Sequence, residues 1–375
     1  GRSLARGHRI HEQAQPDLLL ARLKENEGLL DDASTLLTKM VHDEVRITPA
    51  GEWLLDNYYL IEEQIRTARR HLPKGYSREL PSLSAGASAG LPRVYDLAME
   101  AIAHGDGRID AEMLSRFVAA YQSVTPLKMG ELWAIPIMLR LALIENLRRV
   151  ASRVIADWND CNLAESWADR LAEIAEQDAK SVVLTVADMA RSAPPMTSSF
   201  VAELTRRLQG QSAALDLPLT WIEQLLSESG LSIEHLVQLE AQQQAADQVS
   251  ISHSIGSLRL LSATDWCEFV ESMSIVEQTL REDPAAVYGA MDFATRDHYR
   301  HVVERLARSS KQSEDNVAQA AIALAGEHPA AELAGHVGYY LIDRGLPALQ
   351  TQIGAQLSLR DVRRWLQGCA PLSIY

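Results

Sequence analysis

The sequence predicts an all-α fold, either a multi-helix bundle or an irregular helical array in two packed subdomains. Three observations support this. Ala and Leu dominate the 375 residues, whereas aromatic residues make up only 6%, and this balance favours helices over sheets. Apolar residues recur at spacings of three and four along most of the chain. No run of four or more residues alternates between apolar and polar side chains between hairpin turns, as a strand would.

The helical periodicity can be followed from the N-terminus towards the C-terminus. Apolar faces of amphipathic helices are expected over residues 18–23, 29–37, 53–61, 132–150, 236–239 and 299–306. The longest of these, 132–150, contains Pro136, which removes a backbone donor and predicts a kink or a break there.

Helix starts are predicted where a capping side chain precedes a proline or has capping-box spacing. Thr125-Pro126 and Asp283-Pro284 show the first pattern. Thr220 to Glu223 and Asp265 to Glu268 show the second.

A break rich in proline and hydroxyl side chains divides the chain near its middle. Residues 191–199 contain Pro194-Pro195 together with four Ser or Thr residues. We therefore expect an N-terminal helical subdomain over 1–193 and a C-terminal helical subdomain over 194–375.

The charge and cysteine content narrow the classes of function. A formal net charge of −14 disfavours a nucleic-acid binder and disfavours binding to anionic lipid by charge alone. Cys161, Cys267 and Cys369 have no metal-ligand spacing, which indicates free thiols in a reducing compartment. No membrane span is expected, because Arg140 and Glu145 interrupt the most apolar window, 132–147.

No residue pattern assigns catalysis to this chain. Residues 86–90 match G-x-S-x-G, but the lead-in lacks the strand that a nucleophile elbow needs, so a Ser/Gly loop is expected. No acid–base pair, metal cluster or phosphate-binding loop stands out, so catalytic residues, metal ligands and cofactors are all predicted to be absent.

Two chemically mixed stretches exceed what a minimal helical core needs. Residues 291–301 combine acids, arginines, histidines and aromatic residues, and residues 51–81 combine aromatic rings with charged side chains. The candidate partner- or ligand-contacting residues are Glu52, Trp53, Tyr58, Tyr59, Lys74, Tyr76, Arg78, Glu79, Arg296, Asp297, Tyr299 and Arg300.

Each stretch has two interpretations. Flat aromatic faces with polar edges suit a sugar ring, but Trp53, Tyr58 and Tyr59 also suit a core in which polar tips find partners. Arg296 and Arg300 lie four apart, on one helix face, and either hold a carboxylate or phosphate of a partner or join their helix to a neighbour through a buried network.

These stretches resemble the long N-terminal region of bacterial cyclic β-1,2-glucan synthases, and the resemblance covers most of the chain. The matching runs are residues 51–61, 72–81, 93–97, 130–148, 254–260, 291–300 and 336–343. The stretch from 194 to about 250 matches less clearly.

The resemblance implies the following layout. This region would lie on the cytoplasmic side of the bacterial inner membrane, ahead of membrane helices and a glucosyltransferase domain that uses UDP-glucose. The implied partners are those domains of the same polypeptide, with β-1,2-glucan as a candidate ligand. No catalytic residue of the family can be placed on this chain.

Three hypotheses follow. The first is a non-catalytic helical module that scaffolds or regulates the glucosyltransferase domain. The alternative is a free-standing helical protein-interaction adaptor, which a stop codon directly after Tyr375 would favour. The third is an autonomous sugar-active helical enzyme.

Overall fold

The computed structural model describes residues 1–11, 18–72 and 75–355. These residues form seventeen α-helices, four short 3₁₀-helices and one two-stranded ladder, which confirms the all-α prediction. In the ladder, β1 (Ile10–His11) runs antiparallel to β2 (Ser82–Leu83), with Ile10 opposite Leu83. The chain therefore buries its apolar residues almost entirely through helix–helix packing.

The chain folds into two compact units, and each combines segments that are distant in sequence. Among the described residues, the first unit comprises 1–8, 112–135 and 265–355, and the second comprises those of 9–111 and 136–264. One boundary falls inside a single helix, α7 (Met129–Gln177), between Ile135 and Pro136. The subdomain division predicted after residue 193 cuts the chain at a single point, whereas these units each join distant segments; residues 193 and 194 both lie in the second unit. The predicted division stays a prediction.

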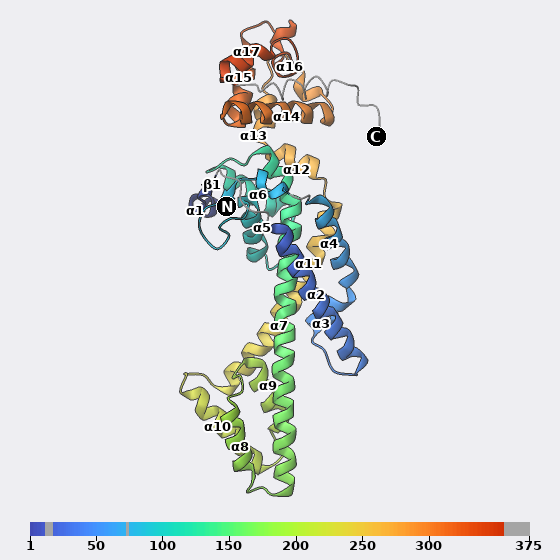
Figure 1. The fold of residues 1–375 in the computed structure, drawn as a ribbon, viewed down its shortest axis with the longest axis vertical. Helices are drawn as coiled ribbons and strands as arrows, with labels where there is room; N and C mark the ends of the chain where they lie inside the picture. The colour runs from blue at the N-terminus through green and yellow to red at the C-terminus, as the bar shows by residue number, and fades with distance from the viewer. Residues whose placement is uncertain (12–17, 73–74, 356–375) are drawn as a thin grey trace. The chain divides into compact units, whose positions relative to one another are not determined.

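The first unit is organised around α15, against which α13, α14, α16 and α17 pack (Figure 1). Tyr288, Val303 and Val317 are among its fully buried side chains. Its helices, besides the first turns of α7, are α1 (Arg2–Gly7), α6 (Ala111–Gln122), α12 (Trp266–Met273), α13 (Ile275–Leu280), α14 (Phe293–Ser310), α15 (Glu314–Gly326), α16 (Val337–Ile342) and α17 (Leu346–Ile353). The 3₁₀-helices η3 (Tyr288–Ala290) and η4 (Leu333–Gly335) lie between them in sequence.

The second unit is built along two long helices, α7 and α11 (Ile233–Ala263), which lie side by side in Figure 1. The Asn146 amide on α7 donates to the hydroxyls of Ser250 and Ser254 on α11, each at 2.9 Å, so a small polar group lies in the contact between the two helices. The remaining helices are α2 (Leu19–His42), α3 (Pro49–Asp56), α4 (Tyr58–His71), α5 (Arg93–His104), α8 (Val182–Ser192), α9 (Ser198–Leu208) and α10 (Asp216–Ser227). The 3₁₀-helices η1 (Tyr76–Glu79) and η2 (Ala213–Leu215) complete it.

One end of the second unit has an apolar core of its own, which we call the distal core. It is formed where α8, α9 and α10 pack against the far half of α7 and the start of α11 (Figure 1). Leu171, Met189, Phe200, Leu204 and Ile222 are fully buried in it.

Helix α7 continues through Pro136, so the break that the sequence allowed there does not occur. A proline inside a helix costs about 3 kcal/mol. Ile135, Leu139 and Leu143 on the same helix are fully buried, and burial of each such side chain stabilises by about 1.5–3 kcal/mol. Packing therefore outweighs the missing hydrogen bond.

The predicted helix starts have mixed outcomes. Asp265 caps α12, because its carboxylate accepts from the backbone N–H groups of Cys267 and Glu268. The prediction at Thr220 is wrong, since this residue lies inside α10 and its hydroxyl donates to the Asp216 carbonyl. The prediction at Asp283 is also wrong: no helix starts at Pro284, and tertiary contacts described below engage the Asp283 carboxylate.

No helix in the described ranges has both the length and the apolar character needed to cross a bilayer. In the most apolar window of α7, the side chains of Arg140, Glu145 and Asn146 are buried within the protein.

Candidate functional site

The stretch from Asp292 to Arg300 forms the first half of α14. Asp292 caps this helix, because its carboxylate accepts from the Thr295 backbone N–H at 2.9 Å. Arg300, two turns further on, has 0% exposure despite its charge. The capped helix start therefore positions a cation in the interior of the first unit.

Arg300 belongs to a group of ionised side chains that we call the Arg300 cluster. Its members are Glu271, Glu277, Arg281, Arg296, Asp297 and Arg300. Arg296 Nη2 lies 2.8 Å from Glu271 Oε2, and Arg300 Nη1 lies 2.9 Å from Glu271 Oε1. Arg300 Nη2 donates to Asp297 at 3.2 Å. Three carboxylates thus face three guanidinium groups, and the cluster is electrically balanced.

Aromatic side chains enclose the Arg300 cluster. The Tyr288 hydroxyl donates to Glu277 Oε2 at 2.6 Å. The Arg300 guanidinium lies 5.2 Å from the centroid of the Phe293 ring, within cation–π range. Trp133, at the start of α7, meets Phe293 edge-to-face at 6.3 Å. Elements α12, α13, η3 and α14 of the first unit therefore meet at one charged centre, and α7 packs an aromatic ring against it.

The cluster maintains its own ionisation. Burial opposes the charge on Arg300, but its hydrogen bonds to Glu271 and Glu277 more than offset this, and the pKa of Arg300 is raised. Burial likewise opposes charge on Glu271, while bonds from Arg296 and Arg300 hold its pKa below the usual range. Burial and the bond to Glu277 raise the pKa of Tyr288. The two arginines are thus engaged by carboxylates of their own chain, as in the buried-network interpretation.

Tyr299 lies beside a second polar centre, which we call the Asp283 clamp. Asp283 accepts four hydrogen bonds: from Val287 N at 3.0 Å, Tyr288 N at 3.1 Å, Val337 N at 2.9 Å and His336 Nδ1 at 2.8 Å. Because an ionised carboxylate only accepts, Nδ1 of His336 carries the proton. Burial raises the pKa of Asp283, but the hydrogen bonds from His336, Val337 and Tyr288 lower it by more. The net pKa lies below its usual range, so Asp283 stays ionised.

The Tyr299 ring packs within the clamp region. It lies 5.9 Å from the Tyr288 ring and 6.3 Å from the His336 ring. Its residue is only 4% exposed, so it contributes to the core of the first unit.

The other candidate stretch lies in the second unit, on α3 and α4. The Tyr58 hydroxyl donates to Asp31 of α2, as expected for an aromatic residue whose polar tip finds a partner. Trp53 and Tyr59 are 39% and 62% exposed, and Glu52 is exposed as well. This stretch therefore combines anchored and solvent-facing aromatic rings.

The remaining candidates lie around η1. Gly75 precedes it with a φ of +86°, a conformation that glycine adopts without strain. Tyr76 is half-buried and Arg78 is exposed. Lys74 lies outside the described residues, and for Glu79 the structure gives the backbone, within η1.

Sequence reasoning missed the carboxylates that organise each unit. In the second unit, Glu145 of α7 accepts from Arg22 Nε at 3.0 Å, Tyr95 Oη at 2.8 Å and Asn26 Nδ2 at 3.5 Å. In the first, Glu271 and Glu277 were not singled out, and Asp283 was predicted only as a helix cap. A charge inside an apolar helical stripe, as at Glu145, is the one signal that was available.

The described part of the chain contains no group of three or more His, Cys, Asp or Glu side chains arranged as a metal site. What the clusters can do chemically is hold helices in fixed positions, because each charge is engaged by an opposite charge or a hydrogen-bond partner from another element.

Comparison with known proteins gives one curated relative. No protein-family model matches the chain. The chain is 34% identical over 355 residues to a cyclic beta-(1,2)-glucan synthase, NdvB, of Rhizobium meliloti (strain 1021). The aligned region is 92% of this chain but 12% of that relative, so the chain spans a small part of the synthase it matches. The match confirms the resemblance drawn from the residues: this chain is similar, along nearly its whole length, to a part of a cyclic β-(1,2)-glucan synthase.

Proposed function

We propose that this chain is a non-catalytic helical module of a cyclic β-(1,2)-glucan synthase and that it positions the glucosyltransferase domain of the same polypeptide. The observation that carries the proposal is the match along 92% of the chain to part of such a synthase. The UDP-glucose site and the transfer chemistry would reside elsewhere in that polypeptide. The module would lie on the cytoplasmic side of the inner membrane.

The geometry of the first unit supports a positioning role. A scaffold must keep its shape while neighbouring domains act, and paired polar networks make a structure rigid and specific. In the Arg300 cluster, the carboxylates and guanidinium groups are engaged with one another, although Arg300 Nε has no hydrogen-bond partner. Sequestered in this way, they are available for support rather than for turnover.

The exposed aromatic rings of the second unit supply a candidate contact surface. Trp53 and Tyr59 keep part of their apolar area in water. Aromatic residues are enriched in protein interfaces because they combine a large apolar area with few rotatable bonds. Contact with either another domain or a β-1,2-glucan chain would use the same faces.

Deletion from an intact synthase tests the proposal. The residues aligned with this chain are removed, and glucan formed from labelled UDP-glucose in membranes is measured per inserted molecule. We expect synthesis to be lost although the shortened enzyme inserts. Undiminished synthesis by a stable, inserted enzyme would exclude a positioning role.

A second measurement addresses catalysis by the chain itself. The purified 375-residue chain is incubated with UDP-glucose and, separately, with β-1,2-glucan, and products are separated by chromatography. We expect no turnover. Formation of any new saccharide would instead support an autonomous sugar-active enzyme.

A further inference from the structure

The Asp283 clamp holds two loops of the first unit, and each loop exposes a large apolar side chain. The first loop, residues 284–288, exposes Val287 to 44%; the second, residues 328–336, exposes Leu333 to 82%. Leu333 is more exposed than any other large apolar side chain in the described residues. Isolated surface leucines are common and need no explanation. Here, however, both loops are fixed by one buried carboxylate.

The backbone of the first loop is held in an unfavourable shape. Ala286 has a φ of +54°, which is uncommon for a residue other than glycine. Its N–H donates to the Asp283 carbonyl at 2.8 Å, and the Asp283 carboxylate accepts from the next two N–H groups. Such a conformation persists only where the surroundings determine it. The clamp therefore imposes the position of Val287.

The backbone of the second loop is equally constrained. A Cβ on Gly335 would lie 2.3 Å from the Pro329 carbonyl oxygen, so only glycine permits this close approach. Directly after it, His336 Nδ1 and Val337 N bind the two oxygens of Asp283. Leu333 thus projects from a turn that is anchored at its C-terminal end.

We propose that the two clamped loops form a docking surface, with Leu333 as its central anchor and Val287 as its second contact, for an apolar pocket in another part of the same synthase polypeptide. A side chain that is presented by a rigid loop loses little conformational entropy on binding, so preorganisation strengthens the contact. This inference rests on the proposed function, whose positioning role it localises.

The charges on the loops favour a protein pocket over a lipid surface. Glu282, Glu327 and Glu332 are exposed on or beside the two loops. Carboxylates are repelled by the anionic headgroups of the cytoplasmic leaflet. The available length of chain points the same way, since the matched synthase extends far beyond the aligned 12%. The pocket is accordingly expected to be apolar at its centre and basic at its rim.

Site-specific photo-crosslinking in the intact synthase tests the proposal. A benzophenone amino acid replaces Leu333, and in a matched control it replaces Leu184, which is 66% exposed on α8 of the second unit. We expect irradiation to join position 333 to a peptide of the synthase outside these 375 residues, identified by mass spectrometry, with a yield above that of position 184. Crosslinks confined to this chain, to lipid or to a second copy, or a yield no higher than the control, would each overturn the proposal.

A variant of the Asp283 clamp tests whether the rigidity of the two loops, and not only the exposure of Leu333, determines the crosslink yield. In Asp283→Asn the amide cannot accept from all four donors, so hydrogen exchange at residues 284–288 and 329–337 should rise and the crosslink from position 333 should fall. An unchanged crosslink yield in loops that exchange faster would contradict preorganisation.

The two proposals fail in different ways. Loss of synthesis on deletion together with no external crosslink would retain the positioning function and remove this docking surface. An external crosslink together with normal synthesis after deletion would retain the contact and remove the function.

Discussion

At Arg300, a guanidinium with no exposure to water lies among Glu271, Glu277 and Asp297. Burying a charge is costly unless opposite charges and hydrogen bonds compensate it. The compensation here comes from helices α12 and α13 as well as from α14 itself. One side chain therefore couples three helices of the first unit.

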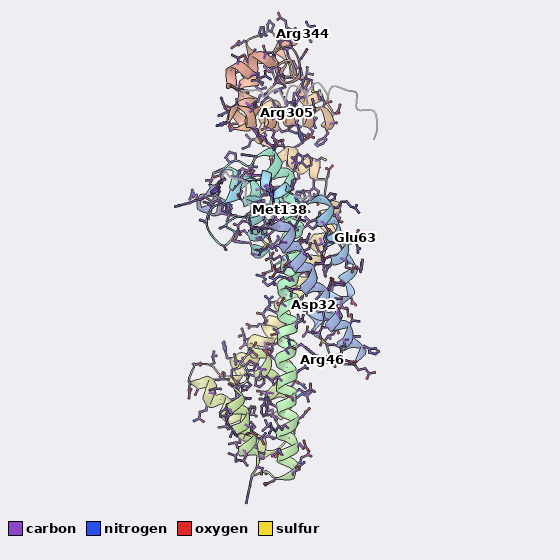
Figure 2. All side chains as sticks on the ribbon, in the orientation of Figure 1. Asp32, Arg46, Glu63, Met138, Arg305 and Arg344 are labelled. Carbon is purple, nitrogen blue, oxygen red and sulfur yellow. The ribbon has the colours of Figure 1, made fainter. Side chains whose placement is uncertain are left out.

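Arg300→Met is expected to destabilise the chain by about 3–5 kcal/mol, because it removes the guanidinium that both Glu271 and the buried Glu277 contact and leaves three carboxylates facing two guanidinium groups. Arg305→Met is the matched control, since Arg305 is exposed on the same helix (Figure 2) and surface changes are usually within about 0.5 kcal/mol. Urea unfolding followed by circular dichroism measures both. Equal midpoints for the two variants would mean that the cluster contributes no stability.

Glu314 makes the free energy of unfolding depend on pH. Burial raises the pKa of its carboxyl to about 7, although the Met129 N–H donates to it; Glu304 and Glu131 raise it and Lys128 lowers it. The folded chain therefore binds more protons than the unfolded chain between pH 4.5 and pH 7. Stability from this group is present below the ordinary pKa and is lost as the pH rises through the raised one.

Glu314→Gln should remove this loss while keeping an acceptor for the Met129 N–H. Since one pKa unit corresponds to about 1.4 kcal/mol, the variant should be more stable than the natural chain at pH 8 by on the order of 3 kcal/mol, and less different at pH 5. Unfolding midpoints across this range measure the effect, and the exposed Glu327→Gln serves as control. A pH profile that is identical in the natural chain and Glu314→Gln would refute the burial of charge at this position.

At the scale of elements, α16 packs closely on α14 through a glycine. A Cβ on Gly338 would lie 2.4 Å from Tyr299 Oη and 2.6 Å from His336 Nε2. The first turn of α16 therefore approaches α14 and its own preceding residue more closely than any side chain would allow.

Gly338→Ala should destabilise the chain by about 1–3 kcal/mol through this overpacking. The matched control is Gly326→Ala at the end of α15, where no atom lies within 4 Å of an added Cβ; it should be neutral or stabilising by about 0.4–1 kcal/mol. Thermal unfolding of both variants gives the comparison. The same shift for both would show that the close approach at α16 has no energetic weight.

At the scale of the whole molecule, the distal core is a separate apolar cluster within the second unit. Helices α7 and α11 are in contact just outside the distal core, where Arg153 Nε on α7 donates to Asp247 on α11 at 3.4 Å. Further from the distal core, Asn146 contacts Ser250 and Ser254. Residue numbers thus fall along α7 as they rise along α11, so the two helices run antiparallel. A short connection between them can therefore replace everything beyond the ion pair.

Replacing residues 158–242 by about six Gly and Ser residues should leave a folded chain, because such a linker spans roughly 13 Å and packed helix axes lie about 10 Å apart. We expect a sharp urea transition and an intact near-ultraviolet circular dichroism signal from the remaining aromatic residues. A broad transition with loss of that signal would show that the distal core is needed for the rest to fold.

How much could be predicted depends on the range of the interactions. The helix at 299–306 followed from local periodicity, and the Asp265 cap from its own neighbours. The predicted face over 53–61 is helical, but it is divided at Asn57 between α3 and α4. The role of Asp283 did not, because its partners include His336 and Val337, more than fifty residues away. For the same reason, the sequence left both interpretations of Arg296 and Arg300 open.

By itself the sequence determined the helical class and, through its long chemically mixed runs, the similarity to part of a cyclic β-(1,2)-glucan synthase, because helix periodicity and sequence similarity are both read along the chain. Only the tertiary structure decided that Arg300 is buried among carboxylates, that each unit joins distant segments, and that Leu333 faces water on a clamped loop. Burial and ion pairing depend on which residues meet in space, and that is settled when the helices pack.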